Sequence, residues 1–389
     1  MAAPSATLLS LLPPMFFWHF IGWVRPLLCD ILLWFLLVRA LRPSRTWRIL
    51  LAVLLALDAA QAPILSYLGD SYLMPDLPGP LYAALKLLRG FALLFFLEAI
   101  LLWPILALAR RLRRPPAPSP RPARRLALAL LLANAALLAT AFANAVVPPR
   151  TAVRELPVVG LPPDLDGYRI LHLSDLHADP IAGAWRTRAI VRRANETAPD
   201  LVCITGDFAD GSCARFAPAL APLADLRAPD GLYACTGNHE YYPPSVHSGW
   251  PAFFADLGIR FPVDAPAIVP RGAAHVAVAS LPDNAPPGAP LPPLPGDFNL
   301  YLKHRPVDLA PLAAAGTDLI LSGHTHGGQF PPLTRLVAAA NEGHLSGLYP
   351  ITPRTRLHVS PGTGQWNGVP YRFPRPSELT LLVLRPAAP

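Results

Sequence analysis

The sequence is poor in charge. Only 15% of its 389 residues are charged, and just two are lysines, whereas an ordinary soluble domain has about 25% charged residues. Together with 52% hydrophobic residues and a mean hydropathy of +0.35, this argues against a wholly soluble protein. The 50 prolines stand among long apolar runs, which excludes collagen-like and low-complexity chains.

Several familiar signatures are missing. The sequence has no P-loop, no G-x-S-x-G and no Rossmann fingerprint, so nothing supports the enzyme classes that carry them. The four cysteines form no C-x-x-C pair and do not decide the redox compartment. No basic segment precedes the first apolar run, which argues against a cleaved signal peptide.

Basic residues are concentrated in the apolar part of the chain. Residues 1–147 contain 14 Arg and Lys against 5 Asp and Glu, and residues 148–389 contain 19 against 20. Arginines in the loops between apolar segments are typical of membrane topology, where they mark the cytoplasmic side. The chain is therefore predicted to be an integral membrane protein with no nucleic-acid-binding surface.

Residues 1–147 are predicted to form a bundle of about four transmembrane helices, and residues 148–389 a separate domain. The stretch 126–147 carries no charge over the length needed to cross a bilayer, roughly 20 residues. The first span is expected to be one bent helix, because a tight turn inside hydrocarbon leaves backbone groups unpaired. The three other spans are placed at about 16–38, 49–69 and 90–109.

The arginine-rich loops predict the orientation. One loop carries three arginines between residues 42 and 48, another carries seven between 110 and 125, and both should stay in the cytoplasm. The loop 70–80 has two acids and no base, as expected outside. The last span then exits, so the C-terminal domain is expected on the extracytoplasmic side. The bias towards Arg, Ala and Pro indicates a GC-rich source, which points to a bacterial inner or plasma membrane.

Five ionisable residues in or beside the apolar segments carry an expectation of their own. Three of them fall near mid-membrane, where such groups either face the bundle interior or serve a function. The other two are expected to reach the outer interface with their charged ends. The mid-membrane residues are Asp30, Asp58 and Glu98, and the interfacial ones are Lys86 and Arg89.

From Tyr168 onward the pattern changes to short apolar runs that alternate with helical stretches such as 184–198. This predicts an α/β domain whose sheets are covered by helices. The expected strands are YRILHLSD, LVCITGD, LYACTGNH, HVAVAS, FNLYLKH, LILSGH, LHVSP and ELTLLVL. Most end in polar residues, and strand ends are where α/β folds place their active sites.

Five of these polar ends together supply the ligands of a two-metal site. Such a site needs oxygens and imidazoles around two ions about 3.5 to 4 Å apart, with one carboxylate shared between them. An Asp-x-His step on an extended strand end would place both side chains on one side. The five ends are Asp175-x-His177, Gly206-Asp207, Gly237-Asn238-His239-Glu240, Lys303-His304 and Gly323-His324-x-His326.

These blocks resemble the calcineurin-like metallophosphoesterase superfamily, whose pattern is DxH, GD, GNH[DE], H and GHxH in that order. The resemblance covers about Ile170 to Gln329, and GHTHGGQ with the later GTGQWNGVPYRF is similar to the membrane-anchored branch of that family. It implies a four-layer αββα sandwich and a metal-dependent phosphoric ester hydrolase.

The resemblance also implies a role for each site residue. Asp207 would bridge two divalent ions, and a hydroxide held between them would attack phosphorus. His239 would stabilise or protonate the leaving oxygen. The first metal would be held by Asp175, His177, Asp207 and His326, and the second by Asp207, Asn238, His304 and His324. Mn, Fe and Zn suit these ligands almost equally.

Other residues near the motifs have weaker expectations. Glu240 is expected to orient a neighbouring histidine, Tyr241 and Tyr242 to wall the pocket or pack, and Gly327 and Gly328 to approach phosphate or make a tight turn. His172 should be a core histidine. The remaining residues considered are His247, His275, His344 and His358, expected not to bind metal, and Arg305, Arg356 and Arg372, each more suited to a surface role than to a substrate phosphate.

The sequence thus predicts a membrane-anchored two-metal phosphoesterase acting on a phosphorylated lipid or cell-envelope intermediate. One alternative is a phosphodiesterase for soluble nucleotides that uses the spans only as an anchor. Another is a transporter or sensor with an accessory phosphoesterase domain, although the spans show no internal repeat. A non-catalytic binding domain is disfavoured because no ligand position is lost. Natural substrate, metal identity, ester type and oligomeric state stay open.

Overall fold

The computed structural model describes residues 24–67, 77–113, 120–241, 249–331, 333–366 and 370–387. It contains two compact units, Met1–Thr140 and Ala141–Pro389. The division falls inside a helix, whereas the sequence suggested a boundary after residue 147. Residues 16–23 of the first predicted span and 70–76 of the predicted external loop lie outside the described residues.

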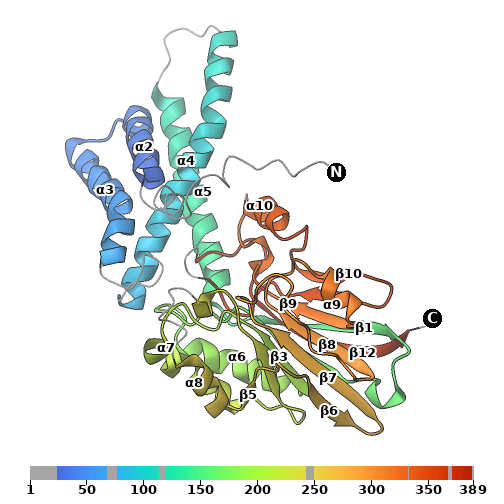
Figure 1. The fold of residues 1–389 in the computed structure, drawn as a ribbon. Coiled ribbons are helices and arrows are strands. Elements are labelled where there is room, and N and C mark those ends of the chain that lie inside the picture. Colours follow the sequence, from blue (N-terminus) through green and yellow to red (C-terminus); the bar gives the residue numbers. More distant parts are fainter. Residues whose placement is uncertain are drawn as a thin grey trace. The chain divides into compact units, whose positions relative to one another are not determined.

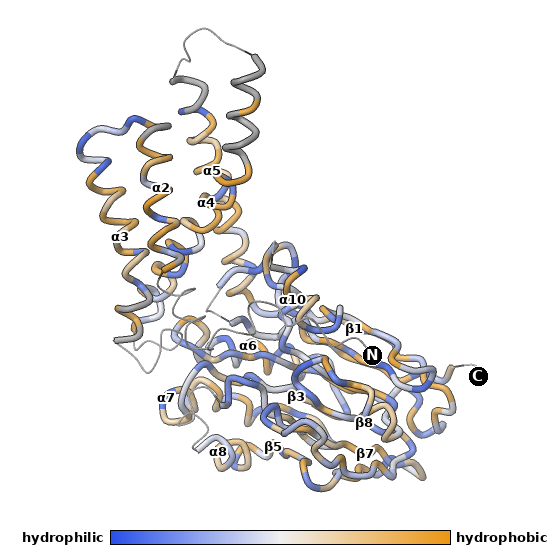
Figure 2. The backbone as a smooth tube through the Cα atoms, turned by 45° about the horizontal axis from the view of Figure 1, so that its top comes forward, coloured by the Kyte–Doolittle hydropathy of each residue, from blue (hydrophilic) through white to orange (hydrophobic). Residues whose placement is uncertain are grey.

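Long helices make up the described part of the first unit. They are α2 (Arg25–Leu41), α3 (Arg45–Tyr67), α4 (Gly79–Arg113) and α5 (Pro120–Val146), which continues into the second unit (Figure 1). Most of their described residues have the colours of hydrophobic residues in Figure 2. In the described ranges, two stretches are long and apolar enough to cross a membrane, Gly79–Glu98 and Arg124–Val146, and Pro26–Val38 is a shorter apolar stretch.

Helices therefore form in all four predicted regions, but four spans are not established. Residues 49–67 of the predicted span 49–69 lie in α3, which is not among the two qualifying stretches, and the qualifying part of α4 begins at Gly79 rather than at residue 90. Periodicity located the apolar runs, but the charged residues inside them made their ends uncertain.

Two ionisable residues of the first unit, Asp58 and Arg89, interact directly. Arg89 Nε donates to Asp58 Oδ1 at 2.8 Å, and Gln61 Nε2 donates to the same oxygen at 2.8 Å. Lys86 and Arg89 are buried, so the prediction that they reach the outer interface was wrong. Lys86 lies over the ring of Tyr82, and Arg89 is paired with Asp58. Asn134 Nδ2 likewise donates to Glu98 Oε2 at 2.9 Å.

The second unit contains two six-stranded sheets. In spatial order, the first sheet holds β1 (Arg150–Val159), β12 (Glu378–Ala387), β2 (Arg169–Leu173), β3 (Leu201–Thr205), β4 (Leu232–Cys235) and β5 (Ile259–Arg260). The second holds β10 (Gly347–Pro350), β11 (Arg356–Val359), β9 (Leu319–Ser322), β8 (Phe298–Lys303), β7 (Ala274–Leu281) and β6 (Ala267–Arg271). Strands β2, β3 and β4 run parallel, as do β7, β8 and β9.

The two sheets pack face to face around one core. Side chains such as Ile170 and Leu201 from the first sheet meet Val276 and Leu300 from the second. Outside them, α6 (Ala184–Glu196), α7 (Cys213–Leu220) and α8 (Trp250–Asp256) lie beside the first sheet, and α9 (Ala310–Ala314) lies beside the second (Figure 1). Helix α10 (Leu333–Ala340) packs against the turn His326–Gly328. Both faces of β3 are buried, which explains its continuous apolar sequence. The predicted two-sheet α/β architecture is confirmed.

Strand β1 was not predicted. It pairs in parallel with β12, with Arg150 opposite Glu378, at the edge of the first sheet. Most of its side chains are exposed, and it contains Pro157, so it has neither the alternation nor the apolar run by which a strand is recognised.

A pair of buried histidines joins the sheets. His172 of β2 and His358 of β11 are fully buried, with their Nδ1 atoms 2.8 Å apart, and His172 Nε2 lies 2.9 Å from Thr205 Oγ1. His172 is thus the core histidine that the sequence predicted. Burial, assisted by Arg154, lowers the pKa of His358 to about 3.

This pair should make the domain sensitive to acid. The unfolded chain protonates His358 near pH 6.5 and the folded chain near pH 3, so stability is complete above pH 6.5 and falls as the pH drops below it. Between pH 7 and pH 5 we expect His358 to account for a loss of about 2 kcal/mol in the free energy of unfolding. Denaturant titrations of His358→Leu should therefore show a shallower pH dependence, whereas the exposed-site control His275→Leu should keep the original slope.

Candidate metal centre

The eight predicted site residues come together at one end of the two sheets. Each of them follows a strand closely, and parallel strands end at the same edge of a sheet. Asp175 and His177 follow β2, Asp207 follows β3, Asn238 and His239 follow β4, His304 follows β8, and His324 and His326 follow β9. Both sheets therefore contribute to the centre.

The backbone at this centre is unusual. Five of the eight residues have a positive φ although none of them is glycine. They are Asp175 (54°), His177 (46°), Asp207 (53°), His324 (69°) and His326 (49°). Asp and His tolerate this left-handed conformation better than most residues, yet each such position stores strain. Asp175 and His177 thus converge through a turn, and the expectation of an extended Asp-x-His step was wrong.

Two glycines allow the loops after β3 and β4 to touch. A Cβ atom on Gly206 would lie 2.3 Å from Gly237 N, and one on Gly237 would lie 2.2 Å from Asp207 Oδ1. Both distances are impossible for a real side chain, so these positions require glycine. The close approach brings Asp207 and Asn238 to the same point.

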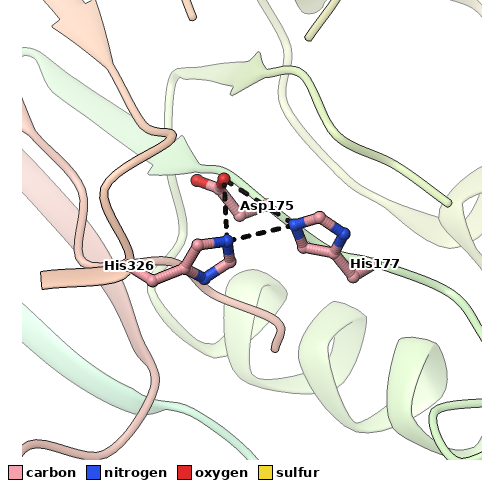
Figure 3. Close-up of side chains that lie close together, drawn as sticks. All are labelled: Asp175, His177 and His326. Atoms are coloured by element: carbon pink, nitrogen blue, oxygen red, sulfur yellow. Dashed lines mark hydrogen bonds and ion pairs between the residues drawn. The ribbon is translucent and has the colours of Figure 1, made fainter. Parts of the chain in front are cut away.

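Asp175, His177 and His326 form one candidate ligand group (Figure 3). His177 Nε2 lies 3.2 Å from His326 Nε2 and 3.9 Å from Asp175 Oδ1, and His326 Nε2 lies 3.4 Å from Asp175 Oδ1. Ligands bound at about 2.0–2.2 Å to one ion lie about 3 to 3.6 Å from one another, so most of these separations fit a shared metal ion.

Asp207, His304 and His324 form a second candidate group. His304 Nε2 lies 3.3 Å from Asp207 Oδ2, 3.2 Å from Asn238 Oδ1 and 3.3 Å from His324 Nδ1. The same Asp207 Oδ2 lies 3.5 Å from His177 Nε2 of the first group. One carboxylate oxygen therefore faces both groups.

The imidazole nitrogens that point away from the candidate ligand groups have partners of their own. His304 Nδ1 donates to Thr205 O at 2.7 Å, which leaves Nε2 free to bind a metal ion. Burial, together with His177 and Arg372, holds the pKa of His326 well below its usual range. His326 is therefore neutral, as a metal-binding histidine must be.

Asp207 makes the potential negative around two histidines of the centre. Burial opposes charge on His304 and His239, yet Asp207 outweighs it and raises the pKa of His304 to about 10 and that of His239 to about 9. A potential that favours protons on buried imidazoles also favours divalent cations, which displace the proton from any ligand they bind. The donor set and its charge both fit metal ions.

A family comparison decides what the second unit is. The model for calcineurin-like phosphoesterases matches residues 168–328, which include all eight site residues. The domain belongs to this family. The match agrees within two residues with the range 170–329 expected from the motifs.

The similarity to known relatives covers more residues than the family model matches. A Danio rerio protein named "Transmembrane protein with metallophosphoesterase domain" is 34% identical over 281 residues, 68% of this chain and 63% of the relative. Its namesake from Bos taurus is 33% identical, covering 63% of this chain and 59% of the relative. An uncharacterized metallophosphoesterase from Helicobacter pylori is 32% identical, covering 56% and 60%. The chain thus spans about three fifths of the length of these relatives.

Asp210 is a residue of the phosphoesterase domain that the sequence analysis missed. Its Oδ1 lies 2.6 Å from His177 Nδ1 and 2.7 Å from His239 Nδ1, and although burial opposes its charge, the two histidines lower its pKa to about 2. Asp210 thus orients both rings. The only sequence signal was an acid three residues after Asp207, which is too common to be recognised alone.

Glu240 does not have the predicted contact. Its carboxylate accepts hydrogen bonds from the backbone N–H groups of Gly237 (2.7 Å), Phe208 (2.8 Å) and Asp207 (3.0 Å), rather than orienting a histidine. Glu240 therefore fixes the backbone on which Asp207 and Asn238 sit, because an acid three residues after Gly237 can fold back onto free amides at a turn.

Replacing Asp210 should impair the centre without dismantling it. Asp210→Asn removes the charge that orients His177 and His239 but keeps the volume, and losses of such partners of metal-binding histidines cost about 10–100-fold. We expect metal affinity and phosphoesterase activity to fall by that factor, measured by metal titration and initial rates. The exposed acid Asp297, changed to Asn, is the matched control, and equal losses in both variants would contradict an orienting role.

The position of Arg372 contradicts the surface role expected from the sequence. It is fully buried, donates to Pro361 O and Gln365 Oε1, both at 2.6 Å, and places Nη2 3.2 Å from His326 Nδ1. This burial was not predictable from the sequence, because the contact of Arg372 with His326 joins positions 46 residues apart. Its backbone also bonds the end of α5, through Ala141 O at 2.8 Å.

The other candidates have contacts outside the two candidate ligand groups. Arg305 pairs with Asp283 at 2.9 Å, and Tyr241 OH lies 2.9 Å from Thr236 Oγ1. At Gly328 a Cβ would meet Leu345 and Thr334 side chains at 2.8 Å, which favours the tight-turn interpretation. In the described residues, His275 and His344 are in no candidate metal group; Tyr242 and His247 lie outside those residues.

Proposed function

We propose that this protein hydrolyses a phosphate ester at a centre of two divalent metal ions. The observation that carries this proposal is Asp207 Oδ2, which lies 3.5 Å from His177 Nε2 in one ligand group and 3.3 Å from His304 Nε2 in the other. A carboxylate shared in this way is what a two-metal hydrolytic site requires.

The proposed ligands are those expected from the motifs. Asp175, His177, Asp207 and His326 would hold the first ion, and Asp207, Asn238, His304 and His324 the second. Two ions bound there would activate water and neutralise charge on the phosphoryl group. Their identity is left to experiment, because these ligands suit Mn, Fe and Zn almost equally.

His239 is the proposed general acid. Its backbone N–H donates to Asp207 Oδ1 at 2.9 Å, and its Nε2 lies 4.0 Å from Asp207 Oδ2, so the ring sits beside the shared carboxylate. Although burial opposes it, Asp207 followed by Asp210 raises the pKa of His239 to about 9. The ring can therefore carry a proton at neutral pH and give it to the leaving oxygen.

The proposed location is a membrane, with the phosphoesterase domain on its extracytoplasmic side. Support comes from the two apolar stretches in α4 and α5, from the names of the vertebrate relatives and from the arginine-rich loops. The four-span arrangement and a bacterial inner membrane belong to this proposal. Attachment to a bilayer favours a phosphorylated lipid or envelope intermediate as substrate.

A transporter or sensor function receives less support. Asp58 is paired with Arg89, and Glu98 accepts a hydrogen bond from Asn134, which are contacts that stabilise a helix bundle. Replacing Asp58 by Asn and Glu98 by Gln should therefore leave metal-dependent hydrolysis intact.

The function is tested with the purified full chain in mild detergent, stripped of metal. Initial rates with bis-p-nitrophenyl phosphate and p-nitrophenyl phosphate are measured after addition of Mn, Zn, Fe or Mg. Metal-dependent turnover is the expected result, and the ratio of the two substrates gives the preference for diesters or monoesters. Two bound metals with no turnover on these substrates or on phospholipids in vesicles would overturn the proposal.

A further inference from the structure

A positively charged cavity lies in the phosphoesterase domain. Its volume is about 460 Å³, within the range of ligand sites. None of its lining residues is a proposed metal ligand. They are Arg150, Arg154, Ser346, Gly347, Pro361, Arg375, Pro376, Ser377 and Glu378.

The cavity has more positive than negative charge. Three arginines face a single carboxylate, Glu378, which already accepts a hydrogen bond from Thr380 Oγ1 at 2.9 Å and lies 3.4 Å from Arg154 Nη2. Arg375 Nη1 donates to Ser346 Oγ at 2.9 Å. Among the described residues, Arg150 has no carboxylate partner for its guanidinium, and neither has Arg375.

The fold holds these guanidinium groups together. Arg150 and Arg154 are four residues apart on β1 and so lie on one face of the strand. The Arg150 backbone N–H donates to Ser377 O at 2.8 Å, which fixes the start of β1 beside Arg375. Arginines bind phosphate oxygens through paired N–H groups, so such a cluster suits a phosphate group.

The chain also limits how far this cavity can lie from a bilayer. The apolar stretch of α5 ends at Val146, only four residues before Arg150. Four residues reach at most ~14 Å, and the headgroup layer is about 5–8 Å thick on each side. Arg150 is therefore held at or near the depth of lipid phosphates, where an arginine side chain can reach an anionic headgroup.

We propose that this cavity binds a phosphate group, supplied by the headgroup of an anionic lipid, at a site separate from the metal centre. This inference rests on the membrane attachment proposed above. The bound headgroup would hold the start of β1 at the bilayer surface. Free phosphate has the same chemistry, and the experiment distinguishes the two sources.

The test uses the full chain in neutral detergent. Native mass spectrometry measures retention of phosphatidylglycerol against phosphatidylcholine. The double variant Arg150→Gln with Arg375→Gln is compared with a control double variant, Arg188→Gln with Arg192→Gln. The control removes the same charge from two exposed arginines of α6. We expect preferential retention of phosphatidylglycerol, reduced about tenfold in the cavity variant and unchanged in the control.

A second arm measures the shift in unfolding temperature caused by inorganic phosphate in chelator-treated protein. A shift that needs Arg150 and Arg375, without lipid preference, would support the phosphate site and assign it to free phosphate. Equal retention of both lipids with no arginine-dependent phosphate shift would overturn the inference.

Hydrolysis of bis-p-nitrophenyl phosphate by metal-loaded protein from the same preparations separates this inference from the proposed function. Activity should be unchanged in the cavity variant, because its residues bind no metal. Lipid preference in a protein without metal-dependent turnover would overturn the proposed function alone.

Discussion

Asp207→Ala should abolish metal-dependent hydrolysis. Asp207 Oδ2 faces both candidate ligand groups, so its removal takes one ligand from each ion and the negative charge that raises the pKa of His304. Loss of a partner outside the ligand set costs about 10–100-fold, and we expect loss of the shared ligand to cost at least ~10³-fold. Initial rates with bis-p-nitrophenyl phosphate, together with metal content by mass spectrometry, measure the effect.

The matched control is Asp297→Asn, which removes an exposed acid of the same domain. It should retain full activity and both metal ions. If Asp207→Ala kept two ions per chain and more than a tenth of the activity, Asp207 would not bridge the two groups. Far-ultraviolet circular dichroism would show that the variant is folded.

His239→Asn should lower kcat by about 10²–10⁴-fold while both metal ions stay bound. His239 lies beside the centre but is a member of neither proposed ligand set, so its loss should affect proton transfer rather than metal affinity. The defect should be large for an alkyl phosphodiester, whose leaving oxygen needs a proton. It should be much smaller for a p-nitrophenyl ester, whose leaving group departs without one.

The pH profile provides an independent check on His239. Its raised pKa of about 9 means that the ring is protonated at pH 7 and loses its proton as the pH rises through that value; bound cations would lower this pKa. The rate of the parent protein should therefore fall on the alkaline side, at or below pH 9, and this fall should be absent in His239→Asn. Equal defects with both leaving groups would assign His239 a structural role.

The sequence predicted the elements of the domain that carry apolar runs. Strands β2, β3, β4, β7, β8 and β9 were recognisable because both faces of a central strand are buried, and the polar residues at their ends marked the edge where the site lies. Strand β1 was not recognisable, because its exposed side chains and Pro157 resemble a loop. Its place is decided by pairing with β12, more than 200 residues away.

The candidate site was predicted better than its surroundings. Motif order identified the eight residues that the fold brings together, since each motif keeps its chemistry within a few consecutive residues. Asp210 and Arg372 were not recognised from the sequence, because their importance lies in contacts made across the fold, with His177 and His326 respectively. The buried pair of Asp58 and Arg89 escaped for the same reason, as 31 residues separate the partners.

The left-handed backbone at the metal centre limits how this site could be transferred to another protein. Asp175, His177 and Asp207 have φ values of 46° to 54°, so a designer who copied only the side chains onto ordinary strand ends would direct their ligand atoms elsewhere. The glycine pair Gly206 and Gly237 would have to be copied as well. A transferred site would therefore need the strand-to-loop turns of this domain as well as its residues.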